Sequence, residues 1–143
     1  MSAKVASAET GSAETGLRNW HRAVDGGNDP ATLAAMIAED AVFHSPVVHT
    51  PQKGRAIVTA YLAAAGKTLA NDSFRYVREL VDGDTAMLEF ETEMDGIHVN
   101  GVDIIRFDEA GTILDLKVMV RPLKAVNKVW EAMAAQLERA RAG

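Results

Sequence analysis

The spacing of apolar residues changes near residue 72, and this change limits the possible folds more than any other feature. Before that point, apolar residues recur at helical spacing in three segments, with one short strand among them. Beyond it they alternate with polar residues over four segments, separated by turn signals at residues 82–84, 95–96 and 108–111. A final segment has helical spacing again. Helices followed by hairpin-linked strands predict an α+β domain with four long antiparallel strands.

Capping residues and glycines set the expected bounds of the first two helices. The first helix has its apolar stripe over residues 17–24 and ends at the glycine pair 26–27. Asp29 is a suitable cap and Pro30 a suitable first residue for the second helix. The apolar spacing carries this helix as far as Ile37.

The remaining bounds come from prolines, glycines and the apolar pattern. We expect a short strand over residues 41–45, a loop over residues 47–53, and a third helix from Gly54 that ends at Gly66. The last helix is expected to bury an apolar stripe that includes Trp130.

Composition excludes several classes of protein and site. The 143 residues suit one domain, and the absence of cysteine excludes disulfides, thiolate zinc sites and a cysteine nucleophile. A net charge of -5 argues against a nucleic-acid partner, and no apolar stretch is long enough for a membrane span. No apolar signal core precedes residue 17, so we expect a cytoplasmic protein. Residues 1–12 are expected to be a flexible tail, because they are polar and begin a short repeat, and residues 13–143 to be the single domain.

Asp103 is the principal candidate for a functional residue. Alternation along its strand places its side chain on the same face as those of Val99, Ile105 and Phe107. A carboxyl group among apolar side chains is costly unless it is hydrogen-bonded, paired or protonated. Such a cost is tolerated most often at functional sites, so we expect Asp103 to point into a ligand pocket.

Three segments carry a resemblance to a known family. They are residues 25–29 with 37–46, residues 53–57 with Tyr61, and residues 101–113. In this order they resemble the SnoaL-like polyketide cyclase and ketosteroid isomerase branch of the nuclear transport factor 2-like superfamily. The resemblance implies a cystatin-like fold, in which a cone-shaped, curved antiparallel sheet packs on N-terminal helices and a C-terminal helix follows. It also implies a homodimer, since the superfamily commonly pairs through its sheet.

The resemblance assigns roles to individual residues. Asp103 matches the isomerase aspartic acid that donates a hydrogen bond to the substrate oxyanion. The isomerase base falls at Ser45 and its first-helix tyrosine at Trp20, so one of three chemical residues is kept, which argues against steroid isomerisation. Tyr61 matches a helix tyrosine that supports the site. Polyketide cyclases of this branch use a pocket aspartate as general acid and base, which suits Asp103 acting with His44 or water, although alternation turns His44 away from the cavity.

Together these observations predict a pocket for a small hydrophobic molecule that bears oxygen. Asp103 and His44 are the candidate catalytic residues, and the candidate ligand-binding residues are Trp20, Ser45, Tyr61, Leu88, Phe90, Ile105, Phe107 and Val118. One hypothesis is an isomerase, cyclase or dehydratase that moves a proton next to a carbonyl group without a cofactor. A second is a non-catalytic binding or carrier protein with the same pocket, and a third is an accessory dimer with a filled cone.

Two other kinds of site are rejected, and one face is left with two interpretations. His44, His49 and His98 lack the spacing of metal ligands, and Arg106 lies on the opposite strand face from Asp103, which excludes the carboxylate–arginine–carboxylate set of limonene epoxide hydrolases. The face that carries Met87 and the three glutamates 89, 91 and 93 is either solvated or a dimer interface. Arg75, Lys117 and Arg121 are the cations expected to oppose those glutamates.

Overall fold

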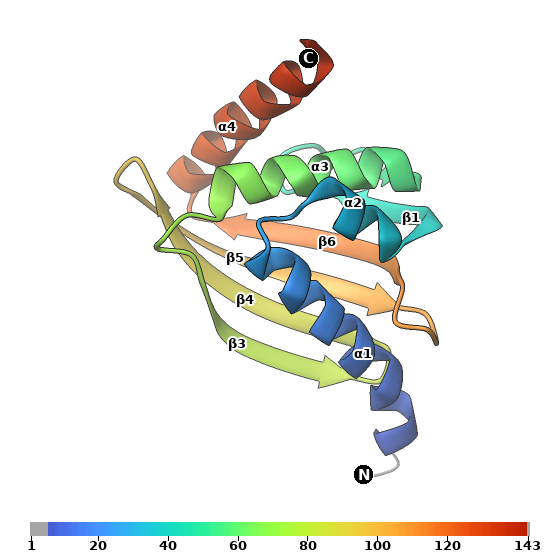
Figure 1. Ribbon diagram of the computed structural model, residues 1–143. Helices are drawn as coiled ribbons and strands as arrows, with labels where there is room; N and C mark the ends of the chain where they lie inside the picture. The colour runs from blue at the N-terminus through green and yellow to red at the C-terminus, as the bar shows by residue number, and fades with distance from the viewer. Residues whose placement is uncertain (1–5, 143) are drawn as a thin grey trace.

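The computed structural model describes the backbone of residues 6–142 and the side chains of residues 13–139. The helices are α1 (Ala6–Asp25), α2 (Pro30–Ala35), α3 (Arg55–Leu69) and α4 (Leu123–Ala142). The strands are β1 (Ile37–His44), β2 (Gln52–Lys53), β3 (Arg75–Asp82), β4 (Thr85–Met94), β5 (Ile97–Phe107) and β6 (Ile113–Arg121). Figure 1 shows these elements along the chain.

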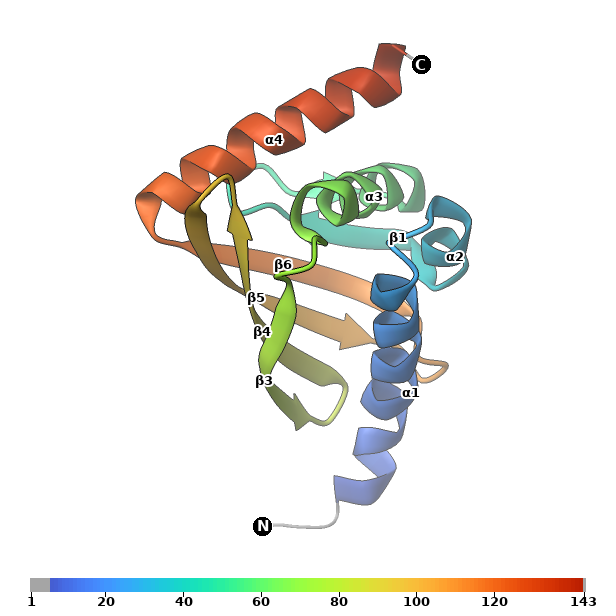
Figure 2. The ribbon, with the colours of Figure 1, turned by 60° about the vertical axis from the view of Figure 1, so that its left-hand side comes forward.

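One six-stranded sheet organises the molecule, in the order β2-β1-β6-β5-β4-β3. Strands β3 to β6 form the expected antiparallel meander, whereas β1 runs parallel to β6. The sheet curves around α1 and α3, and α4 lies across one end of it (Figures 1 and 2). The prediction of an α+β fold with a curved sheet packed on helices is confirmed.

The period-two pattern of β4 and β5 determines which side chains lie on the concave face of the sheet. In β4 the side chains of Leu88, Phe90 and Thr92 are fully buried, and Glu89 and Glu91 alternate with them on the other face. In β5, Gly101 lies beneath the Phe90 ring, where a Cβ atom would come within 2.4 Å of Phe90 Cζ. The absence of a side chain at Gly101 therefore leaves the space that the Phe90 ring occupies.

The buried side chains form two adjoining clusters. One contains side chains of α1, α2, α3 and the strands β1, β4, β5 and β6, and the other contains side chains of α3, α4, the second half of β4 and the start of β5. Tyr61, Tyr76 and Val118 pack against both clusters. The boundary between the clusters therefore crosses the concave face of the sheet beside the middle of β5.

The structure differs from the expected boundaries around the first two helices. Helix α1 begins at Ala6, inside the segment expected to be a tail, and residues 1–5 of that segment lie outside the described residues. Helix α2 is capped as predicted, by the Asp29 carboxylate that accepts from Thr32 N at 3.0 Å, but it ends before Ile37. The β-branched Ile37 is buried opposite Ile113 and starts β1, because the parallel pairing with β6 extends the strand.

Three further predictions need correction. The expected loop over residues 47–53 contains the short strand β2, which pairs with β1. Gly66 does not end α3, since the helix continues to Leu69 with Gly66 buried inside it. Trp130 is 51% exposed, because Ala125, Val129 and Met133 form the face of α4 that packs on the core.

Candidate functional site

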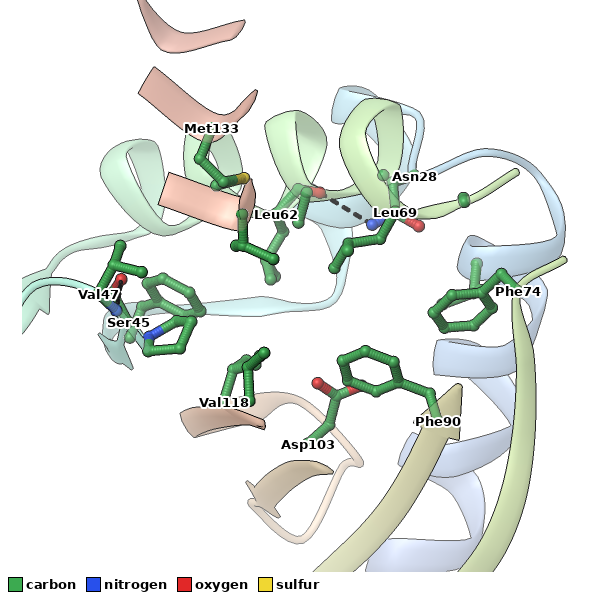
Figure 3. A pocket seen from close by; sticks show the side chains of 18 of the residues that line it. Asn28, Ser45, Val47, Leu62, Leu69, Phe74, Phe90, Asp103, Val118 and Met133 are labelled. Atoms are coloured by element: carbon green, nitrogen blue, oxygen red, sulfur yellow. Dashed lines mark hydrogen bonds between the residues drawn. The ribbon is translucent and has the colours of Figure 1, made fainter. Parts of the chain in front are cut away.

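A pocket opens on the concave side of the sheet, between the two core clusters. Its lining comes from α1, α3 and α4, from residues 45–47 after β1, and from the strands β3 to β6. Its cavity volume is about 70 Å³. Figure 3 shows Leu62 and Leu69 on the helix side, with Val118 and Phe90 on the sheet side. Such an apolar hollow with few polar groups is the usual form of a small-molecule site.

Asp103 is the acidic side chain of this pocket. It lies in the middle of β5, opposite Leu88 of β4 and Val118 of β6, and only 7% of its surface is exposed. Its carboxyl group is directed into the pocket between Val118 and Phe90 (Figure 3). The sequence-based expectation of a buried carboxyl group on this face agrees with the structure.

A chain of two hydrogen bonds ends at this carboxyl group. The Tyr76 hydroxyl donates to Asp103 Oδ2 at 3.1 Å, and Trp20 Nε1 donates to the Tyr76 hydroxyl at 2.9 Å. Because the indole donates, the phenol oxygen acts as acceptor toward Trp20 and keeps its proton for Asp103. Helix α1 and strand β3 thus orient the carboxyl group of β5.

Burial has the largest effect on the pKa values of the Asp103 carboxyl group and the Tyr76 hydroxyl group. Desolvation raises the pKa of Asp103 from 3.8 to about 7, and the hydrogen bond from Tyr76 opposes this rise in pKa. The pKa of Tyr76 is also raised, first by burial and then by the nearby Asp103 carboxylate, so its hydroxyl stays protonated. Asp103 can therefore exist as an acid or as a carboxylate near neutral pH, which suits general acid–base chemistry.

Five of the residues that the sequence nominated line the pocket together: Asp103, Trp20, Ser45, Phe90 and Val118. The Ser45 hydroxyl accepts from the backbone N–H groups of Val47 and Val48 at 3.1 and 3.3 Å, so it also shapes the turn after β1. These residues come from α1, from the turn after β1 and from three neighbouring strands.

The structure places the other nominated residues elsewhere. His44 points away from the pocket, because Phe43 takes the inward position of β1, and its Nε2 lies 3.0 Å from Asp115 Oδ2. Tyr61 does not line the pocket and packs against the Phe43 ring, with centroids 5.4 Å apart. The remaining three lie in the closed core next to α1: Leu88, Ile105 and Phe107. Helix α1 fills that end of the cone, so the hollow is confined to the other end.

Three of the lining residues that sequence reasoning did not nominate shape the pocket. Tyr76 is the most important, since it holds the Asp103 carboxyl group. Phe74 forms an aromatic wall with Phe90, at a centroid distance of 5.3 Å. Asn28 lies at the helix side of the pocket. A strand tyrosine in phase with Phe74 was the available signal, because a buried phenol needs a partner for its hydroxyl.

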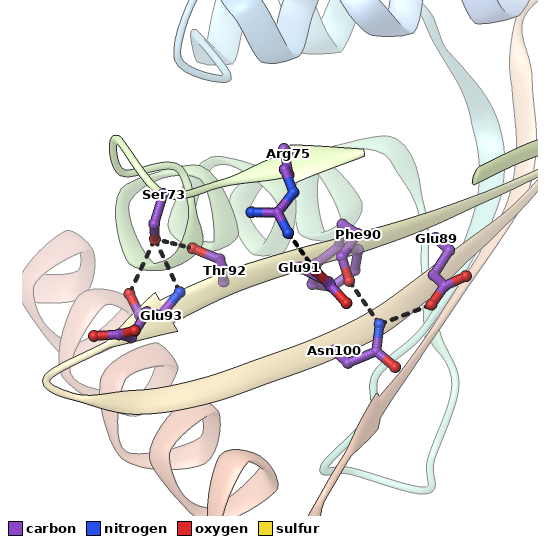
Figure 4. A network of polar contacts seen from close by, with 8 residues as sticks. All are labelled: Ser73, Arg75, Glu89, Phe90, Glu91, Thr92, Glu93 and Asn100. Atoms are coloured by element: carbon purple, nitrogen blue, oxygen red, sulfur yellow. Dashed lines mark hydrogen bonds and ion pairs between the residues drawn. The ribbon is translucent and has the colours of Figure 1, made fainter. Parts of the chain in front are cut away.

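The outer face of the sheet carries the alternating glutamates. Arg75 binds Glu91 at 2.7 Å (Figure 4). Arg78 lies 3.3 Å from Glu89. Asn100 donates to Glu89 at 3.0 Å. Of the cations expected to oppose these glutamates, Arg75 does so, whereas Arg121 donates to Asn100 Oδ1 and Lys117 is paired across the sheet with residues of β1 and β5.

The described part of the chain holds neither a metal-binding group of side chains nor a membrane-spanning helix. No group of three or more histidine, aspartate or glutamate side chains among residues 13–139 is arranged to hold a metal ion. Among the helices that the structure describes, none combines the length and apolar character needed to cross a membrane.

Comparisons with known proteins place this geometry in context. The family model described as the SnoaL-like domain matches residues 17–116. A steroid delta-isomerase from Pseudomonas aeruginosa is 34% identical, with a TM-score of 0.84, and the match covers 93% of this chain and 96% of that one. A protein with a cystatin-like fold from Silicibacter pomeroyi is 32% identical over 82% of this chain and 84% of its own, with a TM-score of 0.75.

A more distant structure shares only the fold. A putative SnoaL-like polyketide cyclase from a Jannaschia species is 11% identical, with a TM-score of 0.64 over 81% of this chain and 92% of its own. The comparison with curated proteins found no match.

Proposed function

Since this chain belongs to the SnoaL-like domain family of the nuclear transport factor 2-like superfamily, we propose that its pocket binds an apolar carbonyl compound and that Asp103 moves a proton on it. The proposed class is an isomerase or cyclase that needs no cofactor. The observation that carries this proposal is the Asp103 carboxyl group, buried in an apolar hollow with a pKa of about 7. Such a group can take and return a proton near neutral pH.

The proposed reaction uses one carboxyl group twice. As a carboxylate, Asp103 takes a proton from the carbon next to the ligand's carbonyl group, and the electron pair of that C–H bond moves toward the carbonyl oxygen. As the resulting acid, it returns the proton to the oxygen or to another carbon of the same conjugated system. Tyr76 and Trp20 act as positioning residues, since their hydrogen bonds hold the carboxyl group throughout.

The surroundings of Asp103 support this use of a single group. Ser45 stands where the isomerases carry their base, and a serine hydroxyl without a neighbouring base does not take a proton from carbon. His44 lies outside the pocket, so it takes no part in the proposed reaction. The apolar walls of Phe74, Phe90 and Val118 exclude water from a charged intermediate.

A non-catalytic binding or carrier protein is the second candidate. It is favoured by the lining itself, because Asp103 and Tyr76 are the only titratable side chains among the described residues of the pocket. With no separate base, Asp103 would then orient a bound carbonyl group by donating a hydrogen bond.

Deuterium exchange separates these two candidates without knowledge of the natural substrate. The protein is incubated in heavy water with benzylacetone, a slender methyl ketone, and deuterium uptake beside the carbonyl group is followed by mass spectrometry. We expect catalysed uptake, and Asp103→Asn should reduce it about 100-fold or more, the usual contribution of a general acid or base. Asp115→Asn is the matched control, because that carboxylate lies outside the pocket, and it should leave the rate unchanged.

Each result of that experiment has a definite meaning. Binding of benzylacetone without catalysed exchange would refute the enzyme and leave the carrier. If the ketone neither binds nor exchanges, both candidates fail. Equal rates in the parent protein and Asp103→Asn would remove Asp103 from the mechanism.

We also propose that two copies pair through the outer face of the sheet. A groove there is lined by the apolar side chains of Leu80, Met87 and Met119, which are 58%, 38% and 49% exposed. Arg78 and Glu89 line the same groove and offer charges of both signs. A surface with apolar residues and both charges can complement a second copy of itself about a two-fold axis.

A further inference from the structure

Asn28 lines the pocket from the helix side, across from the strand that carries Asp103. It follows α1 with a backbone φ of 58°, and its N–H donates to Ala23 O at 2.9 Å. Its side chain is directed toward the pocket (Figure 3) and the residue is 8% exposed. Asparagine is among the few residues that accept this left-handed backbone conformation.

The orientation of the Asn28 amide is fixed by α3. Nδ2 donates to the Leu62 carbonyl oxygen at 2.8 Å. A carbonyl oxygen can only accept, so the nitrogen must face Leu62 and the oxygen must face the other way. The amide therefore cannot turn over without losing this hydrogen bond.

Helix α3 leaves room for this side chain. A Cβ atom at Gly66 would come within 2.5 Å of Asn28 Cβ and 2.8 Å of Asn28 Cγ. Glycine is unfavourable inside a helix, yet Gly66 lies within α3 and not at its end. The space that Gly66 leaves is occupied by Asn28, so the two positions act as a unit.

The Asn28 amide oxygen lacks a hydrogen-bond donor among the described residues. Three buried side-chain atoms of residues 13–139 share this property, and the other two, Thr59 Oγ1 and Thr68 Oγ1, belong to side chains that do not line the pocket. A buried acceptor without a donor is rare in folded proteins and calls for an explanation. Its place in the pocket wall makes a ligand donor the explanation that fits the geometry.

We propose that the pocket recognises a ligand with two polar ends, in which a hydroxyl group donates to Asn28 Oδ1 while a carbonyl group meets Asp103. Between them lies an apolar body that contacts Phe74, Phe90 and Leu69. This inference rests on the proposed function, because it assumes that the carbonyl end binds at Asp103. It adds the chemical class of the ligand, which is a slender hydroxylated ketone.

Two matched ketones test this inference. Benzylacetone has a carbonyl group at one end and a bare phenyl ring at the other, and its para-hydroxy derivative adds one hydroxyl group to the far side of the ring. We expect the parent protein to bind the hydroxylated ketone roughly tenfold more tightly, as measured by calorimetry. Asn28→Gly keeps the left-handed backbone and should abolish that preference, so that the ratio of the two affinities falls to about one.

Gly66→Ala is a second variant, which displaces the Asn28 side chain without replacing Asn28 itself. The added methyl group must displace the Asn28 side chain, so the preference for the hydroxylated ketone should also fall. If both variants lose affinity for the two ketones equally, Asn28 is only structural and the inference is wrong.

The same experiment distinguishes this inference from the proposed function. Equal affinity of the parent protein for the two ketones, with benzylacetone binding that depends on Asp103, would overturn the role of Asn28 and leave the proposed function intact. If neither ketone binds the parent protein, the inference falls together with the proposed function.

Discussion

The ionisation of Asp103 should leave a measurable trace in the pH dependence of stability. The perturbation is Asp103→Asn, which keeps the shape of the side chain and removes its titration. In the unfolded chain this carboxyl group ionises near 3.8, whereas in the folded protein its pKa is about 7. Between these pH values the folded protein holds a proton that the unfolded chain has released, so the free energy of unfolding falls as pH rises.

The size of the effect follows from the two pKa values. Each pKa unit corresponds to about 1.4 kcal/mol, so the full loss of stability amounts to about 4 kcal/mol and is complete above about pH 7. Between about pH 5 and pH 8, the parent protein should lose about 3 kcal/mol relative to Asp103→Asn. The difference between the two proteins isolates this group, because all other carboxylates titrate in both.

Urea unfolding of both proteins at several pH values measures this difference directly. Parallel curves of unfolding free energy against pH would refute the reasoning, since they would mean that Asp103 ionises alike in the folded and unfolded states. Tyr76→Phe supplies a directional check. The Tyr76 hydrogen bond lowers the pKa of Asp103, so its removal should raise that pKa and extend the loss of stability to higher pH.

Two further predictions concern α4 and the outer face of the sheet. Trp130→Ala should change the free energy of unfolding by less than about 1 kcal/mol, because Trp130 is half exposed. Met133→Ala should lower it by about 2 kcal/mol or more, because Met133 is buried. Thermal or urea unfolding of both variants checks this, and equal losses would contradict the packing of α4. Met119→Glu should dissociate the proposed homodimer, because it places a second acid beside Glu89 in the apolar groove. Sedimentation measures the oligomeric state, and a parent protein that sediments as a monomer would refute the dimer.

Much of the sheet could be predicted because its signals are local. Alternation in β4 and β5 identified the buried face correctly, and with it the inward position of Asp103. The same alternation predicted that the His44 side chain points away from the pocket. In the structure it does so, and it contacts Asp115. Strand phase is a property of neighbouring residues, so one sequence is enough to determine it.

The features that sequence reasoning missed depend on contacts between distant segments. Ile37 continues an apolar helical pattern, yet parallel pairing with β6 makes it a strand residue. Leu88 and Phe107 have the right phase for the pocket, but α1 covers them. The role of Tyr76 requires that β3 pair with β4 at the sheet edge and that α1 bring Trp20 to its hydroxyl. Strand phase could nominate Tyr76 as an inward-facing residue, but no local pattern identifies Trp20 and Asp103 as its partners.

The balance of two opposing effects on Asp103 connects the fold to the proposed chemistry. Burial alone favours the protonated acid, and a group that stayed an acid at all physiological pH values could donate a proton but not take one. The hydrogen bond from Tyr76 stabilises the carboxylate and brings its pKa down to about 7, where both forms are populated. Trp20 on α1 donates to the Tyr76 hydroxyl, so the docking of α1 on the sheet helps to hold the donor that faces Asp103. The helix that fills one end of the cone therefore also positions the hydrogen-bond donor on which the proposed proton transfer by Asp103 depends.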